Sequence, residues 1–488
     1  MLNLRDLEYR LISELKSNYD GETNLSSVTN GFDRAGLLSE CIGKVIAKTN
    51  IVSNGFQKGR ASDPPFMYFN GEIYQYLEFS LFRKCIREFL LTIDMKHQDW
   101  IKYKNSILEY AKEPILLNKY LPHPKYIAFK NCVVDFETLE VHPFSPYIHV
   151  DSQLDYDYDM NAQCPKWEQF LVQVLPDYDA RKVIQQYFGL AFLDRYNNET
   201  KVEKALILVG QGSNGKSVIF ETIMNIFGSD NISNMDLNSL AKGGDEGLRS
   251  MAMLDGKRFN YCSEEQIDKV VSRSDIFKTL VSGEPIYARR IGENSFRIDN
   301  VPFLVFNMNK LPKFNDDTHG LYRRIMIVAF DIIIPEEMQD RRLSHKLKEE
   351  RSGILRWLYD GFKELKSNGF QFTTSKTSKK VQRDFIMNQN NVIGWMIVYD
   401  IRSRPKYGVE KDPPMEVSSS NLYDHYIKYC ESNNLASVSQ SSFGRTLTEK
   451  GFDKRRSSNG FYYIYYGFGY DPEVEFTVDE LMEAKDLK

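Results

Sequence analysis

The stretch LILVGQGSNGKSVIF, residues 206–220, constrains the fold more than any other part of this chain. Leu206 to Val209 form a short apolar run typical of a buried strand, and residues 210–217 fit the pattern G-x-x-x-x-G-K-S/T. Apolar residues at helical spacing follow, and Gly228 marks the end of that helix. A strand, a glycine loop and the start of a helix form the setting in which backbone N–H groups converge on phosphate. We therefore predict an α/β core that binds a nucleotide.

The glycine loop predicts a role for several of its residues. Lys216 reaches the β- and γ-phosphates of ATP, the Ser217 hydroxyl ligates Mg²⁺, and Gly215 lets the backbone approach closely. The predicted nucleotide-binding residues are Gly210, Gln211, Gly212, Ser213, Asn214, Gly215, Lys216, Ser217 and Val218. The flanking strand and helix disfavour a chance match, but the loop alone does not distinguish a kinase from a motor or a switch.

Composition restricts the class of protein. The net charge of -4 gives no global sign of a nucleic-acid partner, so any DNA-binding surface must be local. The six cysteines are widely scattered without a C-x-x-C pair, as in free thiols of a reducing compartment. No apolar run approaches the length of about 18 residues that a membrane span needs, and no signal-peptide pattern opens at Met1. We expect a cytoplasmic protein without a membrane partner.

At 488 residues the chain is long enough for several domains. Apolar strands alternate with helical segments over 205–335, as in an α/β nucleotide-binding core. Asn70-Gly71 between aromatic runs predicts a β-hairpin over 66–78. The other predicted regions are a helical N-terminal region (1–60), an α+β region with short strands (61–160), a helical segment (161–204), a second helical segment (336–402), a proline-rich linker (403–417), a compact aromatic unit (418–470) and an acidic tail (471–488).

Two acids follow an apolar strand in GKRFNYCSEEQ, residues 256–266. A nucleotide hydrolase needs an acid on a neighbouring strand to hold Mg²⁺ and to polarise the attacking water. Glu264 and Glu265 can divide these two tasks. The alternative is a helix N-terminus with acids in its first turn, capped by Ser263.

Polar residues lie at the ends of the next two apolar runs of the core. FLVFNMNKLP finishes in Asn307 and Asn309, which can place an amide donor beside a γ-phosphate or can serve as turn residues. In GLYRRIMIVAF, Arg323 and Arg324 precede another apolar strand. An arginine there can neutralise transition-state charge from a neighbouring subunit, or can belong to a surface charge pair.

The order and spacing of glycine loop, acidic pair, asparagine and arginine are more specific than any of these features alone. Over roughly residues 60–470 the chain resembles the phage and plasmid primase–helicase family of superfamily 3 DNA helicases, to which the poxvirus primase–helicase belongs. The stretches that carry the resemblance are CPKWEQFL, NCVVDFETLEVHPF, GQGSNGKS, SEE, NKLP and YRRI. One segment departs from the family, because residues 280–284 read LVSGE where the family usually has leucine-threonine-glycine-glycine-aspartate.

The resemblance implies an AAA+-like P-loop NTPase core that works as a ring, most simply a homohexamer, with ATP and Mg²⁺ as cofactors. It implies that Glu264 holds Mg²⁺ through water, beside the direct ligand Ser217. It also implies an arginine finger, for which we prefer Arg324 to Arg323 because Arg324 adjoins the strand. The predicted catalytic residues are Lys216, Glu264, the second acid Glu265, the sensor Asn309 and the finger Arg324.

A translocating ring also needs a basic element that faces its channel. IYARRIGENSFRIDN, residues 286–300, predicts a β-hairpin with its turn near residues 292–294. In superfamily 3 enzymes such a hairpin grips single-stranded DNA, and the resemblance implies the same role here for Arg289, Arg290 and Arg297. Contacts of this kind follow the phosphate backbone and ignore sequence. The alternative is an ordinary exposed hairpin with solvated arginines.

Residues 418–470 predict a C-terminal winged-helix domain, because two helical segments precede a strand, a turn and a strand. Lys454, Arg455 and Arg456 lie at the predicted wing, and a run of aromatic residues follows from Phe461. Basic residues near aromatic ones suit nucleic acid. The alternative is a winged helix that docks a protein and uses its tyrosines in the core.

These features together predict an ATP-dependent DNA helicase that unwinds forked DNA and binds single strands during replication of a phage, plasmid or genomic island. No metal-carboxylate polymerase site or zinc-ligand cluster is visible before residue 200, so a separate primase or initiator is the expected partner. The alternative is an initiator whose ATPase switches its assembly on DNA without unwinding. A P-loop kinase is disfavoured, because it explains neither the hairpin nor the winged helix.

Overall fold

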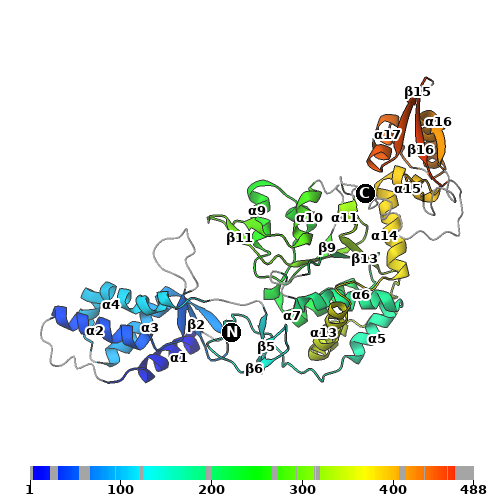
Figure 1. The fold of residues 1–488 in the computed structure, drawn as a ribbon. Coiled ribbons are helices and arrows are strands. Elements are labelled where there is room, and N and C mark those ends of the chain that lie inside the picture. Colours follow the sequence, from blue (N-terminus) through cyan, green and yellow to red (C-terminus); the bar gives the residue numbers. More distant parts are fainter. Residues whose placement is uncertain are drawn as a thin grey trace. The chain divides into compact units, whose positions relative to one another are not determined.

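The computed structural model describes residues 4–21, 31–53, 66–93, 95–120, 125–193, 195, 200–265, 273–292, 294–312, 314, 319–405, 414–433, 435–458 and 460–467. These residues form two compact units (Figure 1). The first comprises Met1–Asn161 with Phe192–Asp194 and Arg289–Phe296, and the second comprises Ala162–Ala191, Arg195–Ala288 and Arg297–Lys488.

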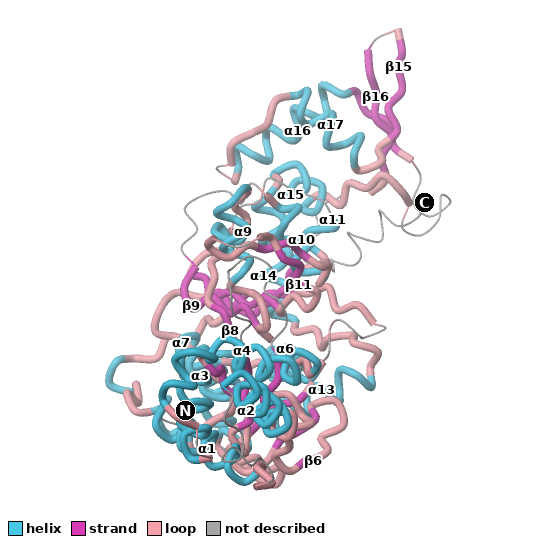
Figure 2. The backbone as a smooth tube through the Cα atoms, turned by 90° about the vertical axis from the view of Figure 1, so that its left-hand side faces the viewer, coloured by secondary structure: helices cyan, strands magenta, loops and turns pink. Residues whose placement is uncertain are grey.

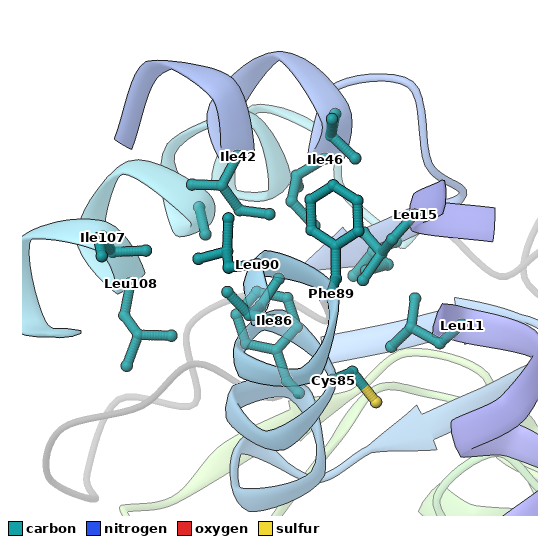
Figure 3. Close-up of a cluster of buried hydrophobic side chains, with 14 of the residues drawn as sticks. Leu11, Leu15, Ile42, Ile46, Cys85, Ile86, Phe89, Leu90, Ile107 and Leu108 are labelled. Atoms are coloured by element: carbon teal, nitrogen blue, oxygen red, sulfur yellow. The ribbon is translucent and has the colours of Figure 1, made fainter. Parts of the chain in front are cut away.

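The described residues of the first unit form helices and two small antiparallel sheets of three strands each. Its elements are α1 (Leu4–Ser17), α2 (Gly31–Ile46), β1 (Ile51–Ser53), β2 (Phe66–Phe69), β3 (Tyr74–Leu77), α3 (Phe79–Thr92), α4 (His97–Leu117), β4 (Tyr126–Ala128), β5 (Val133–Asp135) and β6 (Val141–His142). Figure 3 shows Leu11 of α1, Ile42 of α2, Phe89 of α3 and Ile107 of α4 in one buried cluster. The regions predicted separately as 1–60 and 61–160 thus share a hydrophobic core, because apolar faces from both regions meet.

The hairpin predicted from Asn70-Gly71 is confirmed. β2 and β3 pair antiparallel from Phe66 with Leu77 to Phe69 with Tyr74. Gly71 has φ 101°, a conformation that glycine adopts readily, and the Asn70 side chain accepts hydrogen bonds from the backbone of the turn.

The second unit contains, among its described residues, a five-stranded parallel sheet in the order β13-β7-β12-β9-β8. The strands are β7 (Ala205–Val209), β8 (Ile232–Ser233), β9 (Phe259–Glu265), β12 (Phe303–Met308) and β13 (Ile325–Ala329). Every residue of β12 is buried, as expected for a sheet covered on both faces. This arrangement confirms the predicted α/β class of the core. Because the strands are parallel, the carboxyl ends of β7, β9 and β12 meet at one edge of the sheet, where open α/β sheets bind ligands.

Helices cover this sheet and continue beyond it (Figures 1 and 2). They are α5 (Pro165–Val174), α6 (Tyr178–Gly189), η1 (Leu190–Phe192), α7 (Lys216–Phe227), η2 (Ser229–Asn231), α8 (Leu237–Leu240), α9 (Gly244–Ala252), α10 (Ser274–Ser282), α11 (His319–Tyr322), η3 (Glu336–Met338), α12 (Leu343–Lys348) and α13 (Arg351–Ser367). α6 packs closely on α13, where a Cβ on Gly361 would lie 2.7 Å from the Gln185 backbone. Strands β10 (Ile286–Ala288) and β11 (Phe296–Ile298) pair as a separate two-stranded sheet, as the predicted hairpin requires.

The C-terminal part of the second unit has its own core. Its elements are α14 (Lys376–Gln389), α15 (Asn391–Val398), β14 (Met415–Ser418), α16 (Ser419–Ser432), α17 (Gln440–Glu449), β15 (Asp453–Ser457) and β16 (Gly460–Tyr465). The three strands form an antiparallel sheet in the order β14-β16-β15, and buried Trp395, Tyr426, Phe443 and Tyr463 join it to the helices. The two helices and the strand pair lie where the sequence predicts them, and β14 adds a strand that the sequence did not indicate. The predicted acidic tail, 471–488, lies outside the described residues.

Candidate nucleotide site

The glycine loop, residues 210–217, borders a cavity of about 1050 Å³ at the carboxyl edge of the parallel sheet. One part of its lining comes from the loop and from the ends of β9 and β12, with Lys216, Ser263, Asn307 and Asn309. The rest comes from α5 and from residues 334–349. The cavity is therefore placed where a strand, a loop and the start of a helix converge, as predicted.

The backbone of the loop bends sharply just before α7. Gly215 has φ 88° and Ser213 has φ 59°, so two left-handed residues bend the chain just before α7 begins at Lys216. A Cβ on Gly215 would lie 2.8 Å from Val174 and 3.0 Å from the Phe170 ring. Glycine at this position meets both requirements, because it accepts the positive φ and leaves room for α5.

Lys216 is buried at 7% exposure, and it donates to acceptors of its own loop. Its Nζ donates to the Gly210 carbonyl oxygen and to Asn214 Oδ1, the latter at 3.0 Å. Burial lowers the pKa of Lys216. Asn214 is itself fixed, because its Nδ2 donates to the Phe330 carbonyl at 3.2 Å and so joins the loop to the end of β13. The ammonium group is therefore held by acceptors of its own loop, and little of the residue is accessible to solvent.

Asn307 is the polar centre of the sheet edge. It is 2% exposed and accepts a hydrogen bond of 3.1 Å from the buried hydroxyl of Tyr261 on β9. Its Nδ2 donates to the Ser263 carbonyl at 3.2 Å and to the Lys216 carbonyl at 3.5 Å. Asn307 thus joins β12, β9 and α7. Asn309, the predicted sensor, follows the end of β12, is exposed and lines the same cavity.

The predicted acids lie at the end of β9. Glu265 pairs with Met308 in the register of β9 and β12, and Val209 at the end of β7 pairs with the same methionine. The backbone of the acidic pair is therefore extended strand, and it ends at the edge of the sheet that carries the glycine loop. This argues against the alternative of a helix N-terminus. The side chains of Glu264 and Glu265 lie outside the described part of the structure.

The other wall of the cavity was not foreseen from the sequence. The Ile334 amide donates to the Ser213 carbonyl at 2.9 Å, so the chain after β13 is attached directly to the loop. Lys166 of α5 pairs with Glu349 at 3.2 Å, and both residues line the cavity. A helix with charged residues on one face is common in sequences. Only the fold shows that α5 forms a wall of this cavity.

The structure does not bring Arg324 to the cavity. Arg324 precedes β13, at the amino edge of the sheet, one strand length or roughly 16 Å from the loop edge. Its guanidinium is largely buried and donates to Glu203 at 3.1 Å, to the Ser282 hydroxyl and to the Gly320 carbonyl. Arg323 is 48% exposed at its side chain and also pairs with Glu203, at 2.8 Å. Burial acts against the Glu203 carboxylate, but Ser282 and the two guanidiniums outweigh it and hold the pKa of Glu203 below its usual value.

The predicted DNA-binding arginines near β10 and β11 have partners of their own. Arg297 is about half exposed and pairs with Asp299 at 2.6 Å, and the Arg290 guanidinium lies 4.5 Å from the centroid of the Phe296 ring. Arg289 directly follows β10 and is partly buried.

At the other predicted DNA site, Lys454, Arg455 and Arg456 are exposed along β15. The six cysteines are buried free thiols. Among the helices of the described residues, none combines the length and apolar character that crossing a bilayer takes.

Two families match parts of the chain. Residues 208–324 match the family described as "Family of unknown function (DUF5906)", and residues 80–176 match the family described as "D5 N terminal like". The first match begins in β7 and ends at Arg324, so it spans every residue predicted for catalysis.

Among curated proteins, the putative helicase 184R of Invertebrate iridescent virus 6 is 24% identical over 247 residues, which are 48% of this chain and 25% of that protein. The putative helicase L207/L206 of Acanthamoeba polyphaga mimivirus is 24% identical over 269 residues, which are 51% of this chain and 26% of that protein. The matches thus span about a quarter of these relatives. The apo structure of the NrS-1 C-terminal region, at 13% identity, covers 88% of this chain and 98% of that chain with a TM-score of 0.46.

These matches agree with the resemblance predicted from the motifs. The N-terminal match carries the D5-like name, and the relatives carry the name of putative helicases. In parts, the chain is therefore similar to the family described as "D5 N terminal like" and to viral proteins named putative helicases.

Proposed function

We propose that this chain hydrolyses ATP with Mg²⁺ and couples hydrolysis to the unwinding of duplex DNA, as a superfamily 3 motor that assembles into a ring, most simply a homohexamer. The observation that carries this proposal is the cavity at the carboxyl edge of the parallel sheet. There the glycine loop, buried Lys216 and the ends of β9 and β12 converge on one space.

The glycine loop fits a triphosphate. Ser213 and Gly215 have positive φ angles, which we expect to turn N–H groups of the loop toward the cavity, and α7 begins directly after them with the positive end of its dipole. Lys216 already donates to two oxygen acceptors, so phosphate oxygens can replace them without moving the ammonium into bulk water. The Ser217 hydroxyl, at the first turn of α7, is the expected direct ligand of Mg²⁺, which neutralises charge on the phosphates when bound.

Hydrolysis needs a positioned water molecule and a side chain that contacts the γ-phosphate. The acidic pair ends β9 at the loop edge, so Glu264 is suited to hold the metal through water and Glu265 to orient the attacking water. Asn309 lines the cavity and is suited to contact the γ-phosphate, while buried Asn307 keeps the ends of β9 and β12 in register. In this assignment Asn309 contacts the γ-phosphate, and Asn307 holds the strands that carry the site.

The position of Arg324 supports a shared active site. It lies at the amino edge of the sheet, so it does not act on the nucleotide of its own subunit. In a ring, the amino edge of one subunit can approach the loop edge of the next, where an arginine neutralises transition-state charge. Glu203 and Ser282 would hold Arg324 for that task.

A forked-duplex assay tests the proposal. The purified chain with ATP and Mg²⁺ should release the labelled strand of a fork, and Lys216→Ala protein should not. Turnover of ATP that DNA stimulates, without strand release, would instead favour an initiator whose ATPase switches its assembly on DNA. A separate primase or initiator is the proposed partner, since no metal-carboxylate polymerase site is visible in the sequence before residue 200.

A further inference from the structure

The three cations on β15 lie on one strand but face two ways. β15 pairs antiparallel with β16, and residues paired directly across two strands point to the same face of a sheet. The pairs are Lys454 with Tyr463, Arg455 with Tyr462 and Arg456 with Phe461. Lys454 and Arg456 therefore share a face with Phe461, which we name the Phe461 face, and Arg455 points to the opposite side.

The two faces differ in charge. On the side of Arg455, the register also places Asp453 and Glu416 level with Ile464, so acids accompany the cation. On the Phe461 face, the positions of β14, β15 and β16 that the structure describes carry Met415, Val417, Lys454, Arg456, Phe461, Tyr463 and Tyr465. No acid lies among these strand positions, so the Phe461 face is the side that favours an anion.

Phe461 lies at the outer end of an apolar face. Tyr463 and Tyr465 continue that face inward and are 0% and 5% exposed, whereas Phe461 is 47% exposed. Lys454 Nζ lies 4.3 Å from the centroid of the Phe461 ring, and Arg456 Cζ lies 6.0 Å from it. Phe461, a residue that is nearly half exposed, is thus accompanied by two cations.

Single exposed aromatic residues are common and mean little alone. An aromatic ring beside two cations, on a face without acids among its described strand positions, combines the two elements of single-strand recognition. These are a surface on which a base stacks and charges that pair with the backbone. In a duplex the base faces are already stacked, so a ring of this kind gains contact only with an unpaired base.

We propose that the Phe461 face binds one unpaired nucleotide of single-stranded DNA, with the base stacked on Phe461 and the flanking phosphates paired with Lys454 and Arg456. The proposal rests on the proposed DNA-unwinding function, because it takes DNA as the substrate. It adds the residue that contacts the base and separates Arg455 from its two neighbours on the strand.

Two labelled probes test this proposal with the full chain: a short single strand of DNA, and a strand of equal length that lacks its bases. Phe461→Ala should weaken binding of the normal strand about tenfold, since stacking on one aromatic ring is lost, and should leave binding of the abasic strand unchanged. Lys454→Ala should weaken both strands equally, because it removes only a phosphate contact.

Tyr462→Ala is the matched control, because Tyr462 lies on the opposite face of the same strand. It should change neither affinity. Phe461→Leu keeps an apolar side chain at this position but removes the aromatic ring. Like Phe461→Ala, it should bind the normal strand more weakly and the abasic strand as wild type does. This result would attribute the loss to stacking and not to a folding defect.

The proposal is overturned if Phe461→Ala binds the normal strand like wild type, or if it loses affinity equally for both strands. A chain that binds single strands and shows DNA-stimulated turnover, but is indifferent to Phe461, would refute this inference alone and would favour a protein-docking surface. A wild-type chain that binds neither strand would refute the proposed function as well.

Discussion

Lys216 and the three cations of β15 are all predicted to bind phosphate, and they differ in burial. Lys216 is 7% exposed and donates within its own loop, whereas every residue of β15 is exposed. A charge with little water around it interacts strongly with a phosphate, while charges in solvent are weakened by salt. We therefore expect loss of buried Lys216 to end a reaction, and loss of the three exposed cations of β15 only to weaken a contact.

The largest effect should come from Lys216→Ala. The variant should lose ATP turnover, because no other residue of the loop supplies a positive side chain to the phosphates. Lys242→Ala is a suitable control, since Lys242 forms only an exposed pair with Glu246. A phosphate-release assay compares the two proteins. A folded Lys216→Ala protein with wild-type turnover would contradict the motor function.

Variants of Glu264 and Glu265 test which of the two carboxylates is needed for ATP hydrolysis. Glu264→Gln should keep ATP binding and lose hydrolysis, because the amide keeps the shape but loses the charge. Nucleotide binding and turnover are measured separately. Loss of hydrolysis in Glu265→Gln instead would exchange the two roles, and no loss in either would remove both from the mechanism.

Arg324 is a third kind of cation, because it lies away from the nucleotide cavity of its own subunit. Arg324→Ala should bind ATP but turn it over ~10³-fold more slowly, the usual cost of a lost arginine finger. Mixing it with Lys216→Ala protein should restore part of the activity, because some interfaces then pair an intact lysine with an intact arginine.

Arg323→Ala is the matched control for Arg324, because Arg323 shares Glu203 but is more exposed. It should keep its turnover, since an exposed ion pair contributes little. If Arg323→Ala is the inactive variant, the finger is Arg323, and Arg324 only supports Glu203. Thermal unfolding of both variants shows whether loss of the Arg324 contacts destabilises the fold.

The two asparagines of the sensor strand should separate stability from turnover. Asn307→Leu leaves the buried Tyr261 hydroxyl and the Ser263 carbonyl without this partner, which should lower the free energy of unfolding by about 1–3 kcal/mol. Asn309→Ala should leave unfolding unchanged and reduce turnover, because Asn309 is exposed in the cavity. Denaturant titration measures the free energy of unfolding of both variants, and an ATPase assay measures their turnover.

The smallest effect per residue should appear on β15. Replacing Lys454, Arg455 and Arg456 together with alanine should weaken DNA binding and flatten its salt dependence by about one slope unit per lost phosphate contact. A salt titration of binding measures the slope. An unchanged slope would show that these exposed cations do not meet phosphate.

Local sequence patterns predicted the features that depend on residues close together in the chain. The strand, loop and helix start around Gly215 and the turn at Asn70-Gly71 lie where those patterns place them. The roles of Asn307 and Asn309 differ because one lies within a strand and the other follows it, and a sequence does not show where a strand ends to one residue. The wall from α5 and residues 334–349 depends on contacts between segments far apart in the chain, which no local pattern carries.

The fit of Gly215 against Phe170 and Val174 determines where the protein can be cut into fragments. A piece that begins at residue 205, where the core was predicted to start, would lack the α5 side chains that the loop rests on. It would also lose Tyr187, whose buried hydroxyl donates to the Leu304 carbonyl of β12 at 2.7 Å. Expression of the isolated ATPase core should therefore start near residue 162, ahead of α5 and α6, so that the loop keeps the surface that shapes it.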